Sequence, residues 1–410
     1  MTSLARYVFL LFVLISLAVV ALTESSRGAD EQERQPQKLD GREGRDLLLR
    51  EFRPRPMLRV AEHQLHRSRF PSVDIHTHPS ARLRGSAEAL TDFVSAMDGN
   101  NIAVCVSLDG RLGAELAEHL AYLKPYENRF VVFANIDWQG TGEDDRPETW
   151  SVNQSGFVRQ TVEALREARR QGAVGLKIFK GFGLTVKNVD GSLLQIDDRR
   201  LDPIWQTCGE LKLPILIHTA DPASFFEPID QFNERWAELQ NYPEWSFAGS
   251  EFPRRDELLA ARNRVIKRHP NTKFIGAHVA NSSEDLSVLG GWLEEFPNLY
   301  VDIAARISEL GRQPYTARAF FEKYQDRILF GTDGPRPARL MYYWRFLETY
   351  DEYFPYADLP VPPKGFWRIY GIGLSDDVLR KVYHQNACRL IPEINEKWER
   401  ATSKARSMQK

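Results

Sequence analysis

Short apolar stretches rich in β-branched residues alternate with longer segments of helical periodicity along most of the chain. Strands are predicted at 72–78, 102–108, 130–136, 173–179, 214–220, 272–278, 299–305 and 327–333. Helices are predicted at 86–98, 112–123, 155–171, 199–211, 254–269, 283–296, 314–325 and 375–390. Such alternation is typical of parallel strands covered by helices. Eight such units are the number that closes a (β/α)₈ TIM barrel, which is the fold we predict.

Two connections in this pattern are longer than simple loops. They span 221–253 and 334–374, after the fifth and eighth predicted strands, and both are rich in aromatic residues. In a TIM barrel these insertions lie at the face where active sites are built, and long ordered insertions there often form lids or binding walls. Alternatively, the aromatic side chains only pack the insertions together, and both interpretations can hold. A doubly wound open sheet is less favoured, since no G-x-G-x-x-G follows the first strand.

The N-terminal residues differ from the barrel pattern. Arg6 precedes an apolar run at 7–22, which is shorter than the roughly 20 residues that span a bilayer. We predict a signal peptide at 1–23 and export to the periplasm or the extracellular space, with an uncleaved membrane anchor at 7–22 as the alternative. Residues 24–50 are polar and charged, which predicts a flexible linker. The barrel is then expected at 51–392 and a charged C-terminal tail at 393–410.

Composition excludes some partners and frameworks. The chain is 42% hydrophobic and 27% charged, and its 54 basic and 56 acidic residues give a formal charge of -2. This balance argues against nucleic acid as the main partner, which would favour a strongly basic face. The three cysteines are scattered without a C-x-x-C spacing, so neither a cysteine zinc site nor a disulfide framework is predicted.

Four of the nine histidines and one aspartate lie at the C-terminal ends of predicted strands. They are His76, His78, His218, His278 and Asp333. In a parallel barrel these strand ends converge on one mouth. Any one of these residues could be an ordinary polar group, but their joint placement predicts a metal site. The other five histidines are expected at the surface or in satisfied core positions.

The histidine pair in VDIHTHPS has a spacing that suits a metal ion. His76 and His78 are two residues apart, about 6.6 Å along a strand, and their side chains share a face. Imidazole and carboxylate bind Zn²⁺ in catalytic sites, where an open position keeps a water whose pKa falls to about 7. A nearby carboxylate can accept the proton. We expect one divalent metal, with zinc preferred and manganese or iron as alternatives.

These motifs resemble the amidohydrolase-related superfamily, in particular the branch that includes aminocarboxymuconate-semialdehyde decarboxylase. The resemblance covers about 70–392 and rests on DIHTH, ILIHT, FIGAH, ILFGTD and a late NACRL. It implies that the metal ligands are His76, His78, His218 and Asp333. Asp333 would also handle the proton of the metal-bound water. His278 would polarise or protonate the substrate in a one-metal member and bind the second metal in a two-metal member.

Two basic residues lie near the predicted mouth. Lys177 lies near the position where two-metal members carry a carbamylated lysine, and it faces the bore if Val174, Leu176 and Ile178 face the helices. We favour Lys177 as a cation for a substrate carboxylate in a one-metal site, with a carbamate or an ion pair to Asp302 as alternatives. Arg306, just past the seventh strand, is a second candidate cation. Its alternative role is an ion pair that orders a loop.

The resemblance implies a metal-dependent hydrolase in which metal-bound hydroxide attacks a carbonyl-type centre. Two cations near the mouth suit a small substrate that carries a carboxylate. Non-oxidative decarboxylation in the same one-metal site is the alternative reaction. An exported metal- or ligand-binding protein without catalysis is the alternative from another class, although the presence of His278 and Asp333 argues against it. Barrels of this kind often pair, so a homodimer is a further expectation.

Overall fold

Eight parallel strands form the centre of the protein in a computed structural model that describes residues 46–48, 51–52, 54–359 and 362–408. The strands are β1 (Ser72–Thr77), β2 (Ile102–Ser107), β3 (Phe130–Asn135), β4 (Ala173–Ile178), β5 (Ile215–Ile217), β6 (Phe274–Gly276), β7 (Leu299–Asp302) and β8 (Ile328–Leu329). Each pairs with the next in sequence. The predicted signal peptide or anchor, and most of the predicted linker, lie outside the described residues.

Backbone hydrogen bonds connect the end of β8 to β1 and nearly close the sheet into a barrel. The amide of Ile75 donates to the carbonyl of Phe330 at 3.0 Å, and the amide of Asp333 donates to the carbonyl of His76 at 2.9 Å. The predicted TIM barrel is therefore confirmed, and an open doubly wound sheet is excluded. The same bonds hold the two ends of the barrel sheet together beside the predicted site.

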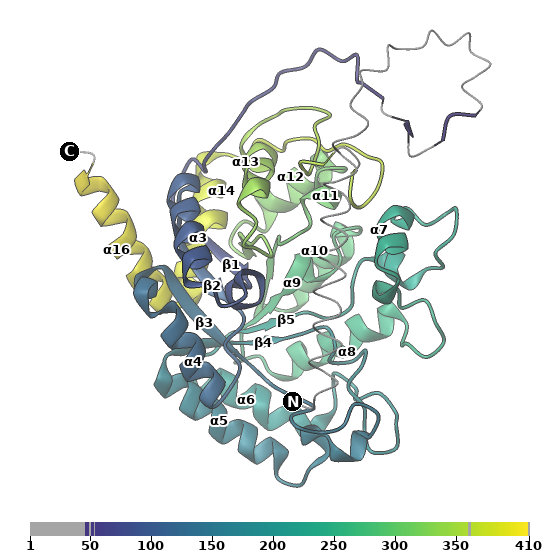
Figure 1. Ribbon diagram of the computed structural model, residues 1–410, viewed down its shortest axis with the longest axis vertical. Coiled ribbons are helices and arrows are strands. Elements are labelled where there is room, and N and C mark those ends of the chain that lie inside the picture. Colours follow the sequence, from purple (N-terminus) through teal and green to yellow (C-terminus); the bar gives the residue numbers. More distant parts are fainter. Residues whose placement is uncertain (1–45, 49–50, 53, 360–361, 409–410) are drawn as a thin grey trace. The chain divides into compact units, whose positions relative to one another are not determined.

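Helices surround the strands in the predicted order (Figure 1). They are α3 (Ala87–Asn100), α4 (Ala114–Leu123), α5 (Phe157–Gln171), α6 (Asp202–Glu210), α8 (Arg255–Arg268), α10 (Leu286–Glu295), α12 (Pro314–Lys323) and α14 (Asp376–Arg380), the last continuing through a π-helical turn, η10 (Lys381–Gln385), into α15 (Asn386–Leu390). Gly172 ends α5 at φ 109°, where a side chain would be strained. Among the described residues, we find no helix with the length and apolarity needed to cross a bilayer.

The opposite mouth of the barrel is covered by a helix that the sequence did not predict. The segment predicted as a charged tail is helical from Pro392 to Met408 (α16). Ile394 is fully buried, and Lys397 donates to the carbonyl of Phe130 at the start of β3 at 2.7 Å. Because α16 covers the N-terminal ends of the strands, the active-site face is left to the loops at the other end.

Three long connections are built on that active-site face. The first insertion contains η7 (Ala223–Phe226), α7 (Trp236–Asn241) and η8 (Pro243–Trp245), and the second contains η9 (Pro337–Arg339) and α13 (Leu340–Glu348). A third, at 179–198 after β4, was not singled out from the sequence. Trp344 and Phe346 in α13 are fully buried, so part of the aromatic content serves packing. Tyr242 and Trp245 stack at 4.3 Å and line a cavity, so other aromatic residues form a wall.

A buried ion pair connects the first insertion to the segment after β7. Arg235 is 1% exposed and contacts the carboxylates of Glu238, at 2.6 Å, and Glu309. Burial by itself would raise the pKa of Glu309, but the charge of Arg235 lowers it to about 2. The pair is therefore ionised at neutral pH, and neither partner can be removed without leaving a buried charge.

Replacing Arg235 by methionine should therefore lower the free energy of unfolding by about 3–5 kcal/mol, the usual cost of stranding a buried ion-pair partner. Urea unfolding followed by circular dichroism measures this change. The matched control is Arg254→Met, because the side chain of Arg254 is 75% exposed and its pair with Asp256 lies at the surface. That variant should lose less than about 1 kcal/mol. Equal losses in the two variants would contradict the assignment.

Candidate metal centre and active site

The ends of β1 and β8 bring together three of the four predicted metal ligands. Nε2 of His76 lies 4.0 Å from Oδ1 of Asp333, and Nε2 of His78 lies 3.7 Å from the same oxygen. The possible ligand atoms of these three residues all lie within 4.8 Å of one another. The contact follows from the barrel, because the closing hydrogen bonds place Asp333 directly beside β1. We call this set the His–His–Asp group.

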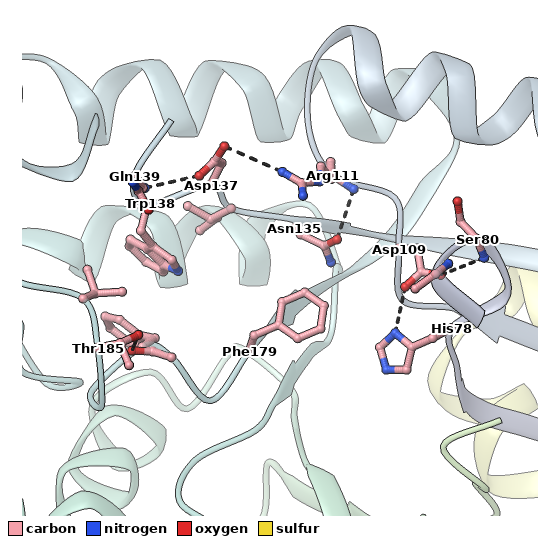
Figure 2. Close-up of a pocket in the computed structure, with 15 residues that line it drawn as sticks. His78, Ser80, Asp109, Arg111, Asn135, Asp137, Trp138, Gln139, Phe179 and Thr185 are labelled. Atoms are coloured by element: carbon pink, nitrogen blue, oxygen red, sulfur yellow. Dashed lines mark hydrogen bonds and ion pairs between the residues drawn. The ribbon is translucent and has the colours of Figure 1, made fainter. Parts of the chain in front are cut away.

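Two further carboxylates orient the histidines of this group. Nδ1 of His76 lies 2.9 Å from Oδ2 of Asp302, and Nδ1 of His78 lies 2.7 Å from Oδ1 of Asp109 (Figure 2). Each carboxylate accepts the Nδ1 hydrogen and leaves Nε2 free toward Asp333, as is usual for metal-binding histidines. Asp109 was missed from the sequence, although it follows β2 as Asp333 follows β8. That strand-end position was the available signal.

Electrostatics keep the group in the form that binds a cation. Burial, with the charge of Lys177, lowers the pKa of His76 well below its usual value, so its imidazole is neutral. Burial opposes ionisation of Asp333, but the neighbouring His76 and Arg82 hold its pKa below the usual value. Metal ions bind neutral imidazole and ionised carboxylate. At neutral pH, His76 therefore offers a nitrogen donor and Asp333 an oxygen donor.

His278 lies in a left-handed turn immediately after β6. Four successive residues, 278–281, have φ between 49° and 60°, which is costly for the β-branched Val279. A Cβ on Gly276 would lie 2.6 Å from that of Ala280, so glycine leaves room for the turn. Asp302 accepts from the amide of His278 at 2.8 Å. Strain of this kind persists only where its surroundings hold it, commonly at functional sites.

The turn aims the His278 ring at the other histidines. Its centroid lies 4.7 Å from that of His76 and 4.5 Å from that of His218. Nδ1 lies 2.8 Å from the carbonyl of Ala304, and because a carbonyl only accepts, Nδ1 carries a hydrogen. Burial lowers the pKa of His278 well below its usual value. The neutral ring therefore has Nε2 as its free acceptor.

His218, the fourth predicted ligand, is placed differently. Its Nε2 lies 3.4 Å from Oδ1 of Asp221, and Lys180 donates to the other oxygen of that carboxylate at 2.5 Å. Among the residues that the structure describes, neither of the two sets of possible ligand atoms includes His218. The sequence placed His218 at the correct strand end but could not show which way its ring nitrogens point.

Lys177 and Arg306, the two predicted cations, lie close to the site. Neither forms the ion pair that was considered as its alternative role. Lys177 is 1% exposed, and its Nζ has no hydrogen-bond partner among the described residues; burial lowers its pKa to about 8. In the register of β4 and β5, Lys177 pairs with Leu216, a residue of the cluster that fills the bore. Val174, expected to face the helices, packs in that same bore cluster. Arg306 is buried and donates to Oδ1 of Asn281 at 2.8 Å instead of pairing with an acid.

Two cavities open beside the His–His–Asp group. The first, of about 600 Å³, is lined by His78 and by the segments that follow β3 and β4, including Trp138 and Phe179 (Figure 2). The second, of about 480 Å³, is lined by Asp333 and His278 and by both insertions. His78 and Asp333 lie 3.7 Å apart, so the group lies between the two cavities.

Several residues of the second cavity were not found from the sequence. Arg82 donates to Oδ1 of Asp333 at 2.9 Å, and Arg336, Arg339 and Lys364 line the same cavity. Arg82 is on α2 (Pro79–Leu83), one helical turn after His78. The only signal for Arg82 in the sequence was its place just after the histidine motif. The sequence does not show that its side chain contacts Asp333, a carboxylate 251 residues later.

The solved structures similar to this chain share little sequence identity with it. Among solved structures, similarity extends over 78% of this chain to three proteins. They are an uncharacterised TIM-barrel protein from Bordetella bronchiseptica (17% identity, 87% of that chain, TM-score 0.44), a dihydroorotase from Campylobacter jejuni (14%, 82%, 0.43) and a dihydroxybenzoic acid decarboxylase from Polaromonas sp. (16%, 96%, 0.43). No curated protein matches the chain.

The family itself is shown by a match along the sequence. The family model described as Amidohydrolase matches residues 73–392, which is most of the chain. The match begins at β1 and includes every residue of the His–His–Asp group. It agrees with the resemblance found in the strand-end motifs. The chain therefore belongs to the amidohydrolase family of TIM-barrel proteins.

Proposed function

We propose that this protein is a metal-dependent hydrolase that acts on a carbonyl-type centre of a small, carboxylate-bearing substrate. The observation that carries the proposal is the His–His–Asp group between two cavities, with two Nε2 atoms at 4.0 and 3.7 Å from one carboxylate oxygen. Two nitrogens and one oxygen, each histidine oriented by a further carboxylate, suit a divalent cation with an open coordination position.

His76, His78 and Asp333 would hold one divalent ion, zinc by preference, which would act as a Lewis acid and make water a stronger nucleophile at neutral pH. Asp302 and Asp109 hold the two imidazoles in the tautomer that offers Nε2. Asp333, ionised at neutral pH, accepts the proton that the attacking water loses. His278, whose Nδ1 is bound to the carbonyl of Ala304, exchanges a proton with the substrate through Nε2.

Two cations stabilise negative charge that develops on the substrate. Lys177 has no hydrogen-bond partner among the described residues although its Nζ is buried, and a buried unpaired ammonium is costly unless an anion reaches it. Arg306 lines the second cavity with a guanidinium Nε that also lacks a partner there. A substrate carboxylate or an oxyanion supplies the missing acceptor for each.

Metal content and turnover of a defined panel test this function. Purified protein should carry one metal per chain by elemental analysis. It should hydrolyse members of a panel of carboxylated esters and lactones, lose this activity after chelation, and regain it with Zn²⁺ or Mn²⁺. Carbon dioxide release from aromatic acids, without ester or lactone hydrolysis, would replace the proposal by decarboxylation. Protein without bound metal and without turnover would favour a non-catalytic binding protein.

A further inference from the structure

The cavity beside His78 offers aromatic surface together with the carboxylates of Asp109 and Asp137. Trp138 and Phe182 stack there with ring centroids 4.6 Å apart, and Phe179 stays 41% exposed in its wall. The one cation in its described lining, Arg111, lies 3.0 Å from Glu115 and 3.7 Å from Asp137. An anion entering this cavity would thus meet carboxylates and no free cation.

The cavity beside Asp333 differs in its charge, because cations outnumber carboxylates in its lining. Its described lining includes seven lysine and arginine side chains and three carboxylates. Two of the arginines, Arg336 and Arg339, make no side-chain hydrogen bond or ion pair with any described residue. Burial and the positive charges of Arg82 and Arg339 lower the pKa of Arg336, as expected where like charges gather. An anionic group in this cavity would relieve that repulsion and gain charge-assisted hydrogen bonds.

We infer that the substrate is bipartite, with an uncharged, flat apolar arm in the cavity beside His78, an anionic arm in the cavity beside Asp333, and the reacting carbonyl between them. The inference rests on the proposed function for the position of the carbonyl. The separation of charge carries it, because the cations of the cavity beside Asp333 attract an anion that the carboxylates of the cavity beside His78 repel. Arg336 and Arg339 then select the anionic arm, and Phe179 selects the apolar one.

Phe179 is the residue best placed to contact the apolar arm. Its ring centroid lies 5.9 Å from that of His78 and 5.4 Å from Nζ of Lys177, so the exposed ring lies directly beside the site. Covering the exposed ring with an apolar group would stabilise the complex, by about 25 cal/mol of free energy for each Å² of apolar surface removed from water. A flat group stacked on Phe179 would reach toward Trp138, which lies on the side of Phe179 away from His78 (Figure 2).

Three related compounds test the two arms separately. Phenylacetylglycine carries a phenyl group and a carboxylate on opposite sides of an amide carbonyl. Acetylglycine lacks the phenyl group, and phenylacetylglycinamide lacks the negative charge. Isothermal titration of the full chain with its bound metal should show phenylacetylglycine binding about 10-fold or more tightly than either truncated compound. Affinity for phenylacetylglycine no higher than for both truncated compounds overturns the inference.

Variants assign each arm to its cavity. Phe179→Ala should weaken both phenyl compounds and leave acetylglycine unchanged, and Phe179→Leu should weaken them less. The double variant Arg336→Gln with Arg339→Gln should weaken both carboxylates and leave phenylacetylglycinamide unchanged. Tyr315→Ala, at a 90% exposed position, and Arg166→Gln, at a half-exposed one, are the matched controls and should change nothing. A variant that weakens all three compounds equally refutes the arm assigned to it.

The two proposals fail in different ways. Binding that depends on both arms, without turnover of any ester, lactone or amide by metal-loaded protein, removes the hydrolase proposal and leaves the bipartite site standing. Hydrolysis that is indifferent to both arms removes the bipartite site and leaves the hydrolase proposal standing. The titration and the turnover assay therefore report on different claims, and each variant should be measured in both.

Discussion

Replacing His78 by alanine is expected to weaken metal binding by more than about 100-fold and to abolish turnover. Loss of an outer partner of a ligand alone typically costs about 10–100-fold in metal affinity, and the variant loses the ligand itself. It leaves one imidazole and one carboxylate, which is fewer than catalytic zinc sites use. Elemental analysis after gel filtration, and competition with a metal-sensitive dye, measure the change.

The matched control for that variant is His66→Ala, because His66 is exposed and lies outside the site. Its metal content should equal that of the unaltered protein. Asp109→Asn supplies an intermediate, since it keeps His78 but removes the carboxylate 2.7 Å from Nδ1. This variant should lose about 10–100-fold in metal affinity. Full metal occupancy in folded His78→Ala would show that the His–His–Asp group is not the metal site.

Replacing Asp333 by asparagine is expected to reduce kcat by about 10²–10⁴-fold, the usual contribution of a positioned general base. Asparagine keeps an oxygen near Nε2 of His76 and His78 but cannot accept a proton at neutral pH. The structure predicts that the unaltered carboxylate is ionised, since His76 and Arg82 hold its pKa below the usual value. Steady-state kinetics on the best panel substrate, with metal content measured in parallel, separate proton transfer from metal loss.

Asp377→Asn is the control for this substitution, because the side chain of Asp377 is 90% exposed and remote from the strand ends. It should keep the kcat of the unaltered protein. If Asp333→Asn retains metal and more than about a tenth of kcat, Asp333 does not act as a general base, because that role contributes about 100-fold or more. The proton would then leave through another group, and His278, whose ring centroid lies 4.7 Å from that of His76, is the alternative that we would test next.

Most of the secondary structure followed from local patterns. The predicted strand at 72–78 is β1 at Ser72–Thr77, and the predicted helix at 155–171 is α5 at Phe157–Gln171. These segments were found because apolar periodicity reflects which face of each element is buried. The predicted strand at 272–278 is shorter, ending at Gly276, because His278 begins a left-handed turn. No local pattern marks a turn that distant side chains stabilise.

The strand-end positions of His76, His78 and Asp333 could be read from the chain, because parallel strands in a closed barrel end at one mouth. The direction of each ring nitrogen could not. It depends on Asp302 for His76, on Asp109 for His78 and on Asp221 for His218, and each contact requires a particular side-chain rotamer. Position alone cannot separate a histidine aimed at the centre from one aimed at its neighbour, so His218 as a metal ligand stays a prediction.

The order of eight strand–helix units, the mouth at which the chemistry gathers, and the residue types able to bind a metal are all properties of the linear chain. Local periodicity and short motifs encode them, because they depend on neighbours a few residues apart. The pairing of Arg82 with Asp333, the unpaired Nζ of Lys177, and the gathering of cations in one of the two cavities arise only on folding. These features join residues hundreds of positions apart, where distance and orientation, rather than residue type, determine the interaction.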